Sequence, residues 1–152
     1  MQNQSCCFSG RREIRDMEYS QVQKRLKEAI ISQINKGIRS FLVRGELGFD
    51  MMAALSVLSL KPKHPHIKLI LMLPYTEQNV CWQSSDISTY KFILDNVDSV
   101  VYTSRHYHND CVLARDRHFV DISRACVCYW EGENPEYIAS YAQEKSLEII
   151  HI

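Results

Sequence analysis

Apolar residues recur along this chain in two alternating patterns, which predict strands separated by helices. Short apolar runs predict strands at residues 5–9, 40–44, 67–73, 99–103, 125–130 and 147–150. Apolar residues at helical spacing, with helix start and stop signals, predict helices at 19–34, 48–60, 89–96, 109–124 and 134–144. Strands that alternate with helices indicate an α/β fold with a mostly parallel, doubly wound sheet of about six strands. The segment 48–60 is apolar nearly all round, which predicts a central, buried helix.

Two glycines follow the second predicted strand and open that buried helix. The segment reads Arg44-Gly45-Glu46-Leu47-Gly48-Phe49-Asp50. Glycine tolerates positive φ and close approach, so this turn can bring backbone N–H groups and a helix N-terminus to an anion. A tight strand-to-helix connection with no ligand would use the same residues. Glu46 and Asp50 are the only acids in the turn, so they are the acid–base candidates if the protein is a hydrolase.

Arginines supply the candidate anion contacts elsewhere. Arg11 and Arg12 follow Gly10 at the end of the first predicted strand, where they can bind a phosphate or carboxylate or form a solvated basic turn. Arg115 and Arg117 point to nearly opposite faces of the helix at 109–124. Arg115, nearer the helix start, is the candidate for ligand contact, with a structural role as the alternative. Arg117 shares a face with Asp121, and we expect these two residues to pair.

Composition narrows the functional classes. Lysine plus arginine equals aspartate plus glutamate at 18 each, so no global charge favours nucleic acid or an anionic membrane. No apolar run approaches the ~20 residues that cross a bilayer. The start lacks a signal-peptide pattern, so a cytoplasmic location and reduced, mostly buried cysteines are expected. His106, His108 and Cys111 lack a fourth ligand at a common zinc spacing, and neither a metal nor a cofactor is expected.

Four segments, taken together and in order, resemble the YpsA-like proteins of the SLOG (SMF/DprA–LOG) superfamily. They are Cys7-Phe8-Ser9-Gly10-Arg11-Arg12, then Arg44 to Asp50, then Leu73-Pro74-Tyr75 with Gln78 and Trp82, and finally Tyr107, Cys111 and Arg115-Asp116-Arg117-His118-Phe119-Val120-Asp121. The similarity is collinear and extends from about Cys6 to Ile152. It implies a Rossmann-like three-layer sandwich in one domain over residues 1–152. It also implies a homo-oligomer, a dimer or tetramer, for which Met51, Leu55 and Leu58 would extend the apolar surface.

The resemblance also implies a ligand and its site. Other members of the superfamily sense or process nucleotide signals in bacterial conflict systems, including ADP-ribose derivatives, and small phage proteins can sequester such signals. A nucleotide or nucleotide-derived ligand of the ADP-ribose type is therefore expected. The expected ligand-binding residues are Ser9, Gly10, Arg11, Arg12, Gly45, Glu46, Leu47, Gly48, Asp50, Pro74, Tyr75, Trp82 and Arg115.

Departures from the family pattern bear on the reaction. The LOG enzymes of the superfamily cleave nucleoside monophosphates with a Pro-Gly-Gly-x-Gly-Thr-x-x-Glu motif, which is absent here. The family's Gly-Gly-Thr turn is replaced by Glu131-Gly132-Glu133, whose carboxylates would repel a phosphate. Binding without turnover is therefore the leading expectation. The alternatives are an N-glycosidase or phosphoribohydrolase that uses Glu46 or Asp50, and a structural oligomerising protein.

Overall fold

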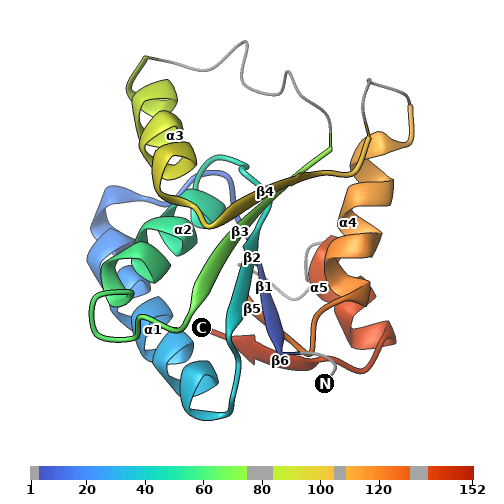
Figure 1. Cartoon of the computed structure of the whole chain (residues 1–152), viewed down its shortest axis with the longest axis horizontal. Helices are drawn as coiled ribbons and strands as arrows, with labels where there is room; N and C mark the ends of the chain where they lie inside the picture. The colour runs from blue at the N-terminus through green and yellow to red at the C-terminus, as the bar shows by residue number, and fades with distance from the viewer. Residues whose placement is uncertain (1–3, 75–83, 105–108, 131–136) are drawn as a thin grey trace.

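Strands and helices alternate along the whole described chain (Figure 1). The computed structural model describes residues 4–74, 84–104, 109–130 and 137–152. The strands are β1 (Ser5–Gly10), β2 (Ser40–Val43), β3 (Lys68–Leu73), β4 (Ser99–Tyr102), β5 (Ala125–Tyr129) and β6 (Glu148–His151). The helices are α1 (Asp16–Asn35), α2 (Phe49–Leu60), α3 (Ser84–Asn96), α4 (Cys111–Asp121) and α5 (Tyr137–Glu144). The predicted α/β class is confirmed.

The described strands form one sheet, and each of its strand pairings is parallel. The strand order is β4-β3-β2-β1-β5-β6. The chain therefore builds outward from β1 to β4 and then crosses back to place β5 on the other side of β1. In open parallel sheets, ligands bind beyond the carboxyl ends of the strands at such a reversal. The segments that follow β1, β2 and β5 are thus the first places to look for a site.

Helices cover both faces of the sheet, which gives three layers (Figure 1). Helices α1, α2 and α3 lie on one face, and α4 and α5 lie on the other. Because side chains alternate along a strand, each strand supplies both cores. Phe8 and Phe41 belong to the core under α1 and α2, whereas Cys7 and Leu42 belong to the core under α4 and α5. Burial on both faces explains why the strands are nearly continuous apolar runs.

Helix α2 is buried, as its composition predicts. Eight of its 12 residues are buried, and it packs against α1, α3 and the first three strands. Met51 is only 7% exposed, and Leu55 and Leu58 are partly buried against the same core. The chain's own packing therefore buries Met51 and partly covers Leu55 and Leu58, which leaves less apolar surface on α2 than the sequence suggests. The oligomeric state itself stays a prediction.

Helices α1 and α3 begin earlier than predicted. Helix α1 starts at Asp16 rather than at 19, and α3 starts at Ser84 rather than at 89. The added residues are mostly polar, and those whose burial is described are exposed or partly buried, so they carry no apolar periodicity. No helix within the described ranges is long and apolar enough to cross a membrane.

The described cysteines follow the prediction. Each of them is free and buried; they are Cys6, Cys7, Cys111, Cys126 and Cys128. Burial raises the pKa of the Cys6 thiol well above its ordinary value, so that thiol stays protonated and unreactive in the folded protein. Cys81 lies outside the described residues.

Candidate functional site

The candidate site is the edge of the sheet where β1 and β2 end. Ser9, the penultimate residue of β1, is fully buried on the α4 and α5 side, next to Cys128 of β5. Its hydroxyl has no hydrogen-bond partner among the described residues. Buried hydroxyl groups are nearly always hydrogen-bonded. This oxygen is therefore an unsatisfied polar group at the end of β1, beside the sheet reversal.

The glycines have the backbone conformation that the sequence predicts. Gly45 has a φ of 76° and Gly48 a φ of 79°. A Cβ on Gly48 would overlap the backbone carbonyl groups of Arg11 and Arg12, and a Cβ on Gly45 would lie 2.8 Å from Leu73 Cδ2. The close approach that requires glycine is therefore made by the chain itself, as in the tight-connection alternative. A ligand contact at Gly45 or Gly48 stays a prediction.

The loop after β1 is fastened to the start of α2. The Phe49 N–H donates to the Arg11 carbonyl oxygen at 2.9 Å. Gly10 faces the Phe49 ring, which occupies the space where a Cβ on this glycine would lie. One of the amides at the N-terminus of α2 is thus already bonded within the chain. This end of the helix therefore has fewer free N–H donors for an anion than the strand–glycine–helix pattern alone predicts.

Asp50 forms a buried ion pair with Arg44. Its carboxylate accepts hydrogen bonds from the Arg44 backbone N–H at 3.0 Å and from Arg44 Nε and Nη2 at 3.1 Å. The Asp50 side chain is 1% exposed. Burial acts to lower the pKa of Arg44, but the charge and hydrogen bonds of Asp50, together with the charges of Asp116 and Glu46, outweigh it and the pKa is raised. These contacts give Asp50 a structural role at the end of β2, and any ligand or catalytic role would compete with Arg44.

Glu46 joins two arginines that are far apart in the sequence. Its Oε1 accepts from Arg12 Nη1, and its Oε2 accepts from Arg115 Nη2, each at 3.2 Å. Arg12 lies in the loop after β1 with 61% of its side chain exposed, whereas the Arg115 side chain, on α4, is 1% exposed. Glu46, at 24% exposure, therefore links a solvent-facing arginine to a buried one.

Arg115 crosses from α4 to the ends of β2 and β3. Its Nε donates to Asp116 Oδ1 at 2.6 Å, and its Nη1 donates to the carbonyl oxygens of Arg44 and Met72 at 3.2 and 3.4 Å. With Glu46 on Nη2, each guanidinium nitrogen has a partner, as a buried arginine requires. Burial raises the pKa of Asp116, and Arg115 opposes that shift. Arg115 thus reaches the candidate edge, and its contact with a ligand stays a prediction.

Arg11 contacts a different carboxylate. Its Nη1 lies 4.0 Å from Oε1 of Glu18, in the first turn of α1. The Tyr129 hydroxyl donates to Glu18 Oε2 at 2.7 Å, and this hydrogen bond holds the Glu18 pKa below its ordinary value. A carboxylate therefore occupies the N-terminus of α1, where the helix dipole favours negative charge. An anionic ligand at this point would meet a charge of its own sign.

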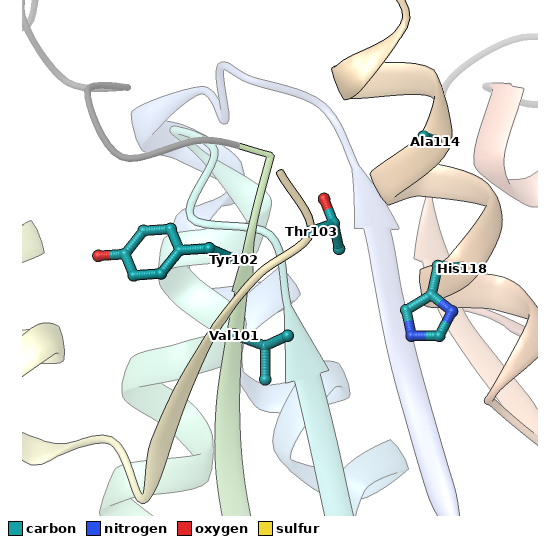
Figure 2. A pocket seen from close by; sticks show the side chains of 5 residues that line it. All are labelled: Val101, Tyr102, Thr103, Ala114 and His118. Atoms are coloured by element: carbon teal, nitrogen blue, oxygen red, sulfur yellow. The ribbon is translucent and has the colours of Figure 1, made fainter. Parts of the chain in front are cut away.

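A pocket of 350 Å³ lies between β4 and α4 (Figure 2). It is lined by Val101, Tyr102, Thr103, Ala114 and His118. In Figure 2, Val101 lies on the side of the strand that faces α4, whereas the Tyr102 ring points the other way. The His118 imidazole and the Thr103 hydroxyl are the polar side-chain groups of the lining that belong to this side. Ala114 directly precedes Arg115, so α4 contributes both to the pocket and to the arginine contacts at the strand ends.

The other predicted residues divide into two groups. Leu47 packs partly buried against the α2 core, and Pro74 is buried directly after β3. Tyr75, Trp82, His106, His108 and the acidic turn at 131–133 lie outside the described residues. Within the described ranges, no group of histidine, cysteine and acidic side chains could hold a metal ion.

Helix α4 differs from the prediction in its side-chain partners. The pairing of Arg117 with Asp121 is wrong: Arg117 Nε donates to the Tyr137 hydroxyl at 3.3 Å, and Asp121 accepts from Tyr141 at 3.0 Å. Both tyrosines come from α5, so packing between the two helices replaces the pairing within α4. Asp110 does precede the helix, but its side chain makes no capping hydrogen bond.

Sequence reasoning missed three residues of the charged network: Arg44, Asp116 and Tyr129. Arg44 carried a usable signal, because it ends an apolar strand directly before the glycine turn and lies six residues before Asp50. Tyr129 ends β5 at the sheet reversal, which is also a predictable position. Asp116 carried no signal in the sequence, because its contact with Arg115 forms only when the Arg115 side chain reaches the sheet edge in the folded chain.

Comparison with known proteins identifies a family and several relatives. Residues 10–149 match the profile of YpsA, described as the YspA SLOG family. A UPF0398 protein of Halalkalibacterium halodurans is 32% identical over 118 residues, which cover 75% of this chain and 61% of that protein. A UPF0398 protein of Bacillus cereus is 28% identical over 131 residues, which cover 82% of this chain and 70% of that protein. The chain thus spans less than two thirds of the first relative.

A solved structure shares the fold. It comes from a study of the single-stranded DNA binding mode of DNA processing protein A from Helicobacter pylori. It superimposes with a TM-score of 0.63 at 14% identity, covering 97% of this chain and 64% of that one. The parallel sheet with helices on both faces and the profile match over residues 10–149 lead to one assignment. The chain belongs to the YpsA SLOG family.

Proposed function

We propose that this protein binds a nucleotide or a nucleotide-derived molecule of the ADP-ribose type, and that it releases the ligand unchanged. The observation that carries the proposal is the pair of arginines, Arg12 and Arg115, that converge on one carboxylate at the carboxyl edge of the sheet. Two guanidinium groups directed at one point form a site for an oxyanion such as a phosphate. The edge adjoins the β1/β5 reversal, where α/β sheets bind their ligands.

The pocket between β4 and α4 gives the uncharged part of such a ligand a place to bind. Its volume of 350 Å³ is near the lower end of the range for small-molecule sites. Val101 and Ala114 supply apolar walls, and Thr103 and His118 supply hydrogen-bonding groups. A flat heterocycle with polar edges matches this combination. We propose that the base enters this pocket while the phosphate lies toward Arg12 and Arg115.

The arrangement of the acids supports binding rather than turnover. General acid–base catalysis needs a carboxyl group with an oxygen directed at the substrate or at water. Each oxygen of Glu46 contacts an arginine, and Asp50 is buried against Arg44. In this arrangement neither candidate acid is placed to take a proton from an attacking water. We therefore propose a role as a sensor or a sequestering protein for a signalling nucleotide, as in bacterial or phage defence, with Glu46-dependent cleavage as the alternative.

The experiment that tests this proposal is a binding and turnover assay on one sample. Purified protein is titrated calorimetrically with AMP, ADP-ribose and a short single-stranded oligonucleotide, and each mixture is then analysed by mass spectrometry after long incubation. The proposal predicts that a nucleotide binds and is recovered intact. Release of free base would favour the enzyme. Binding of the oligonucleotide alone, or of nothing, would refute the proposal.

A pair of variants ties binding to the site. Arg12→Gln should weaken nucleotide binding by at least about tenfold, because it removes an exposed guanidinium that contacts Glu46 and the phosphate position. Arg25→Gln is the matched control, since Arg25 is an exposed arginine in the middle of α1. Both variants lose one positive charge, so only a local contact can separate them. Equal affinities in the two variants would remove Arg12 from the site.

A further inference from the structure

Glu46 occupies the position that an anionic ligand would need. Its two carboxylate oxygens each contact one guanidinium group, from Arg12 on one side and from Arg115 on the other. Phosphate oxygens are spaced like carboxylate oxygens, and arginine binds both groups through the same planar donors. The two arginines thus form a receptor for one oxyanion, and a side chain of the chain itself fills it.

The local charges are balanced while Glu46 is in this position. Asp50 compensates Arg44, and Asp116 contacts Arg115 through Nε. Glu46 then supplies the negative charge that Arg12 and Arg115 still require. When the Glu46 carboxylate moves away, one net positive charge is left between these two arginines. An incoming phosphate is therefore strongly attracted only after Glu46 has left.

Among the three carboxylates, Glu46 is the one that can leave without disturbing the fold. Asp50 is buried and holds the β2 backbone through the Arg44 N–H, and Asp116 is largely buried beside Arg115. Glu46 lies in the loop between β2 and α2, is partly exposed, and contacts Arg12, which faces solvent. Rotation of such a side chain takes picoseconds to nanoseconds. Displacement of Glu46 therefore requires no rearrangement of the backbone.

We infer that Glu46 competes with the ligand's phosphate for Arg12 and Arg115, and that binding of a phosphate-bearing nucleotide displaces its carboxylate. This inference rests on the proposed function, and it adds how the site changes when a phosphate-bearing ligand binds. A phosphate can replace Glu46 because it brings the negative charge that the arginines lose. An uncharged nucleoside cannot. Displacement of Glu46 therefore lowers the affinity for phosphate-bearing ligands, whereas a ligand that leaves Glu46 in place is unaffected.

The test compares Glu46→Gln with wild type in calorimetric titrations of inorganic phosphate, AMP and adenosine. Glutamine keeps the shape of the side chain but removes the competing charge. Glu46→Gln should bind phosphate and AMP at least about tenfold more tightly than wild type, with adenosine unchanged. Glu13→Gln is the matched control, because Glu13 is an exposed acid in the loop after β1. It removes the same charge and should change each affinity less than about twofold.

Each outcome decides the question. Weaker binding of AMP by Glu46→Gln would show that Glu46 contacts the ligand favourably, and equal binding would show that it does not compete; both overturn the inference. If wild type binds no nucleotide but Glu46→Gln binds phosphate, the competition is supported and the proposed function fails. If neither protein binds phosphate, the inference is overturned.

A measurement on the unmodified chain keeps the test independent of the variant's folding. Carboxyl-¹³C NMR of glutamate-labelled wild type should show the Glu46 signal moving toward that of a solvated carboxylate as AMP is added. Adenosine should leave the signal in place. A Glu46 signal that stays fixed while AMP binds would refute displacement.

Discussion

The buried ion pair of Arg44 and Asp50 predicts that Asp50 stabilises the fold, whereas a ligand-binding role would predict an effect on binding alone. We consider Asp50→Asn, which keeps the shape of the side chain and removes its charge. In the wild-type protein the Asp50 carboxylate accepts three hydrogen bonds from Arg44, one of them from the backbone. Asparagine offers a single acceptor oxygen, so at least one of these donors faces an amide group instead.

The expected loss in free energy of unfolding follows from the buried positive charge that Arg44 keeps in this variant. Breaking a buried ion pair by neutralising one partner costs about 3–5 kcal/mol, because the other charge stays buried without compensation. The Arg44 side chain is 12% exposed and can be partly hydrated, which places the expected loss near the lower end, at about 3 kcal/mol. For a chain of this length, that corresponds to a fall in Tm of roughly 6–12 °C.

The assay is urea unfolding followed by circular dichroism, with two reference variants. Asp110→Asn is the matched control, because Asp110 is exposed and makes no capping hydrogen bond; it should change stability by less than about 0.5 kcal/mol. The double variant Arg44→Met with Asp50→Asn should recover most of the lost stability, since it removes the uncompensated charge. If Asp50→Asn costs no more than Asp110→Asn, the pair contributes little and the reasoning fails.

Three further predictions concern the glycine turn, acid stability and assembly. Gly48→Ala should cost at least about 3 kcal/mol in urea unfolding, because its Cβ would overlap the carbonyl groups of Arg11 and Arg12 at positive φ; Gly37→Ala has the same handicap of φ but open space, and should cost only about 1–2 kcal/mol. Burial acts to raise the pKa of Asp98, but hydrogen bonds from Lys61 and the Leu69 N–H outweigh it and lower the pKa. Its contribution to stability is therefore complete above the ordinary aspartate pKa and is lost as pH falls through the lowered value, so the stability of Asp98→Asn should depend less on pH between neutral pH and about pH 2. Sedimentation velocity should show a dimer or tetramer at micromolar concentration, and a monomer alone would contradict that expectation.

The sheet could be predicted because its strands are buried on both faces. A parallel strand covered by two helical layers must be apolar at nearly every position. The sequences of β3 and β5 show such nearly continuous apolar runs. The first turns of α3 carried no such signal, because Ser84, Ser85 and Asp86 form a polar start. Apolar periodicity cannot detect a helical turn that packs against little.

The site was predictable in position but not in its contacts. Strand ends and glycine turns indicate which loops meet at one edge and point to Arg12 and Glu46, whereas Arg115 is indicated by its place near the start of its helix. Their pairing depends on side chains separated by 34 and 69 positions in the sequence, which no local pattern encodes. The role of Asp50 was missed for a different reason, because its partner Arg44 lies only six residues away. In the sequence alone, Arg44 reads as the last residue of a strand rather than as the partner of a buried acid.

The buried thiols of β1 and β5 can report when the centre of the sheet opens. Cys7 and Cys126 are register partners, and both are fully buried while the two strands stay paired. A thiol reagent can therefore reach them only when the middle of the protein opens, and its rate of reaction counts those events directly. With Cys81 and Cys111, which lie outside β1 and β5, replaced by serine, labelling of the remaining cysteines would time the separation of β1 from β5 without any added probe. In the presence of an oxidant, Cys7 and Cys126 could form a disulfide between the two strands during one opening event. A transient opening would then be recorded as a covalent bond.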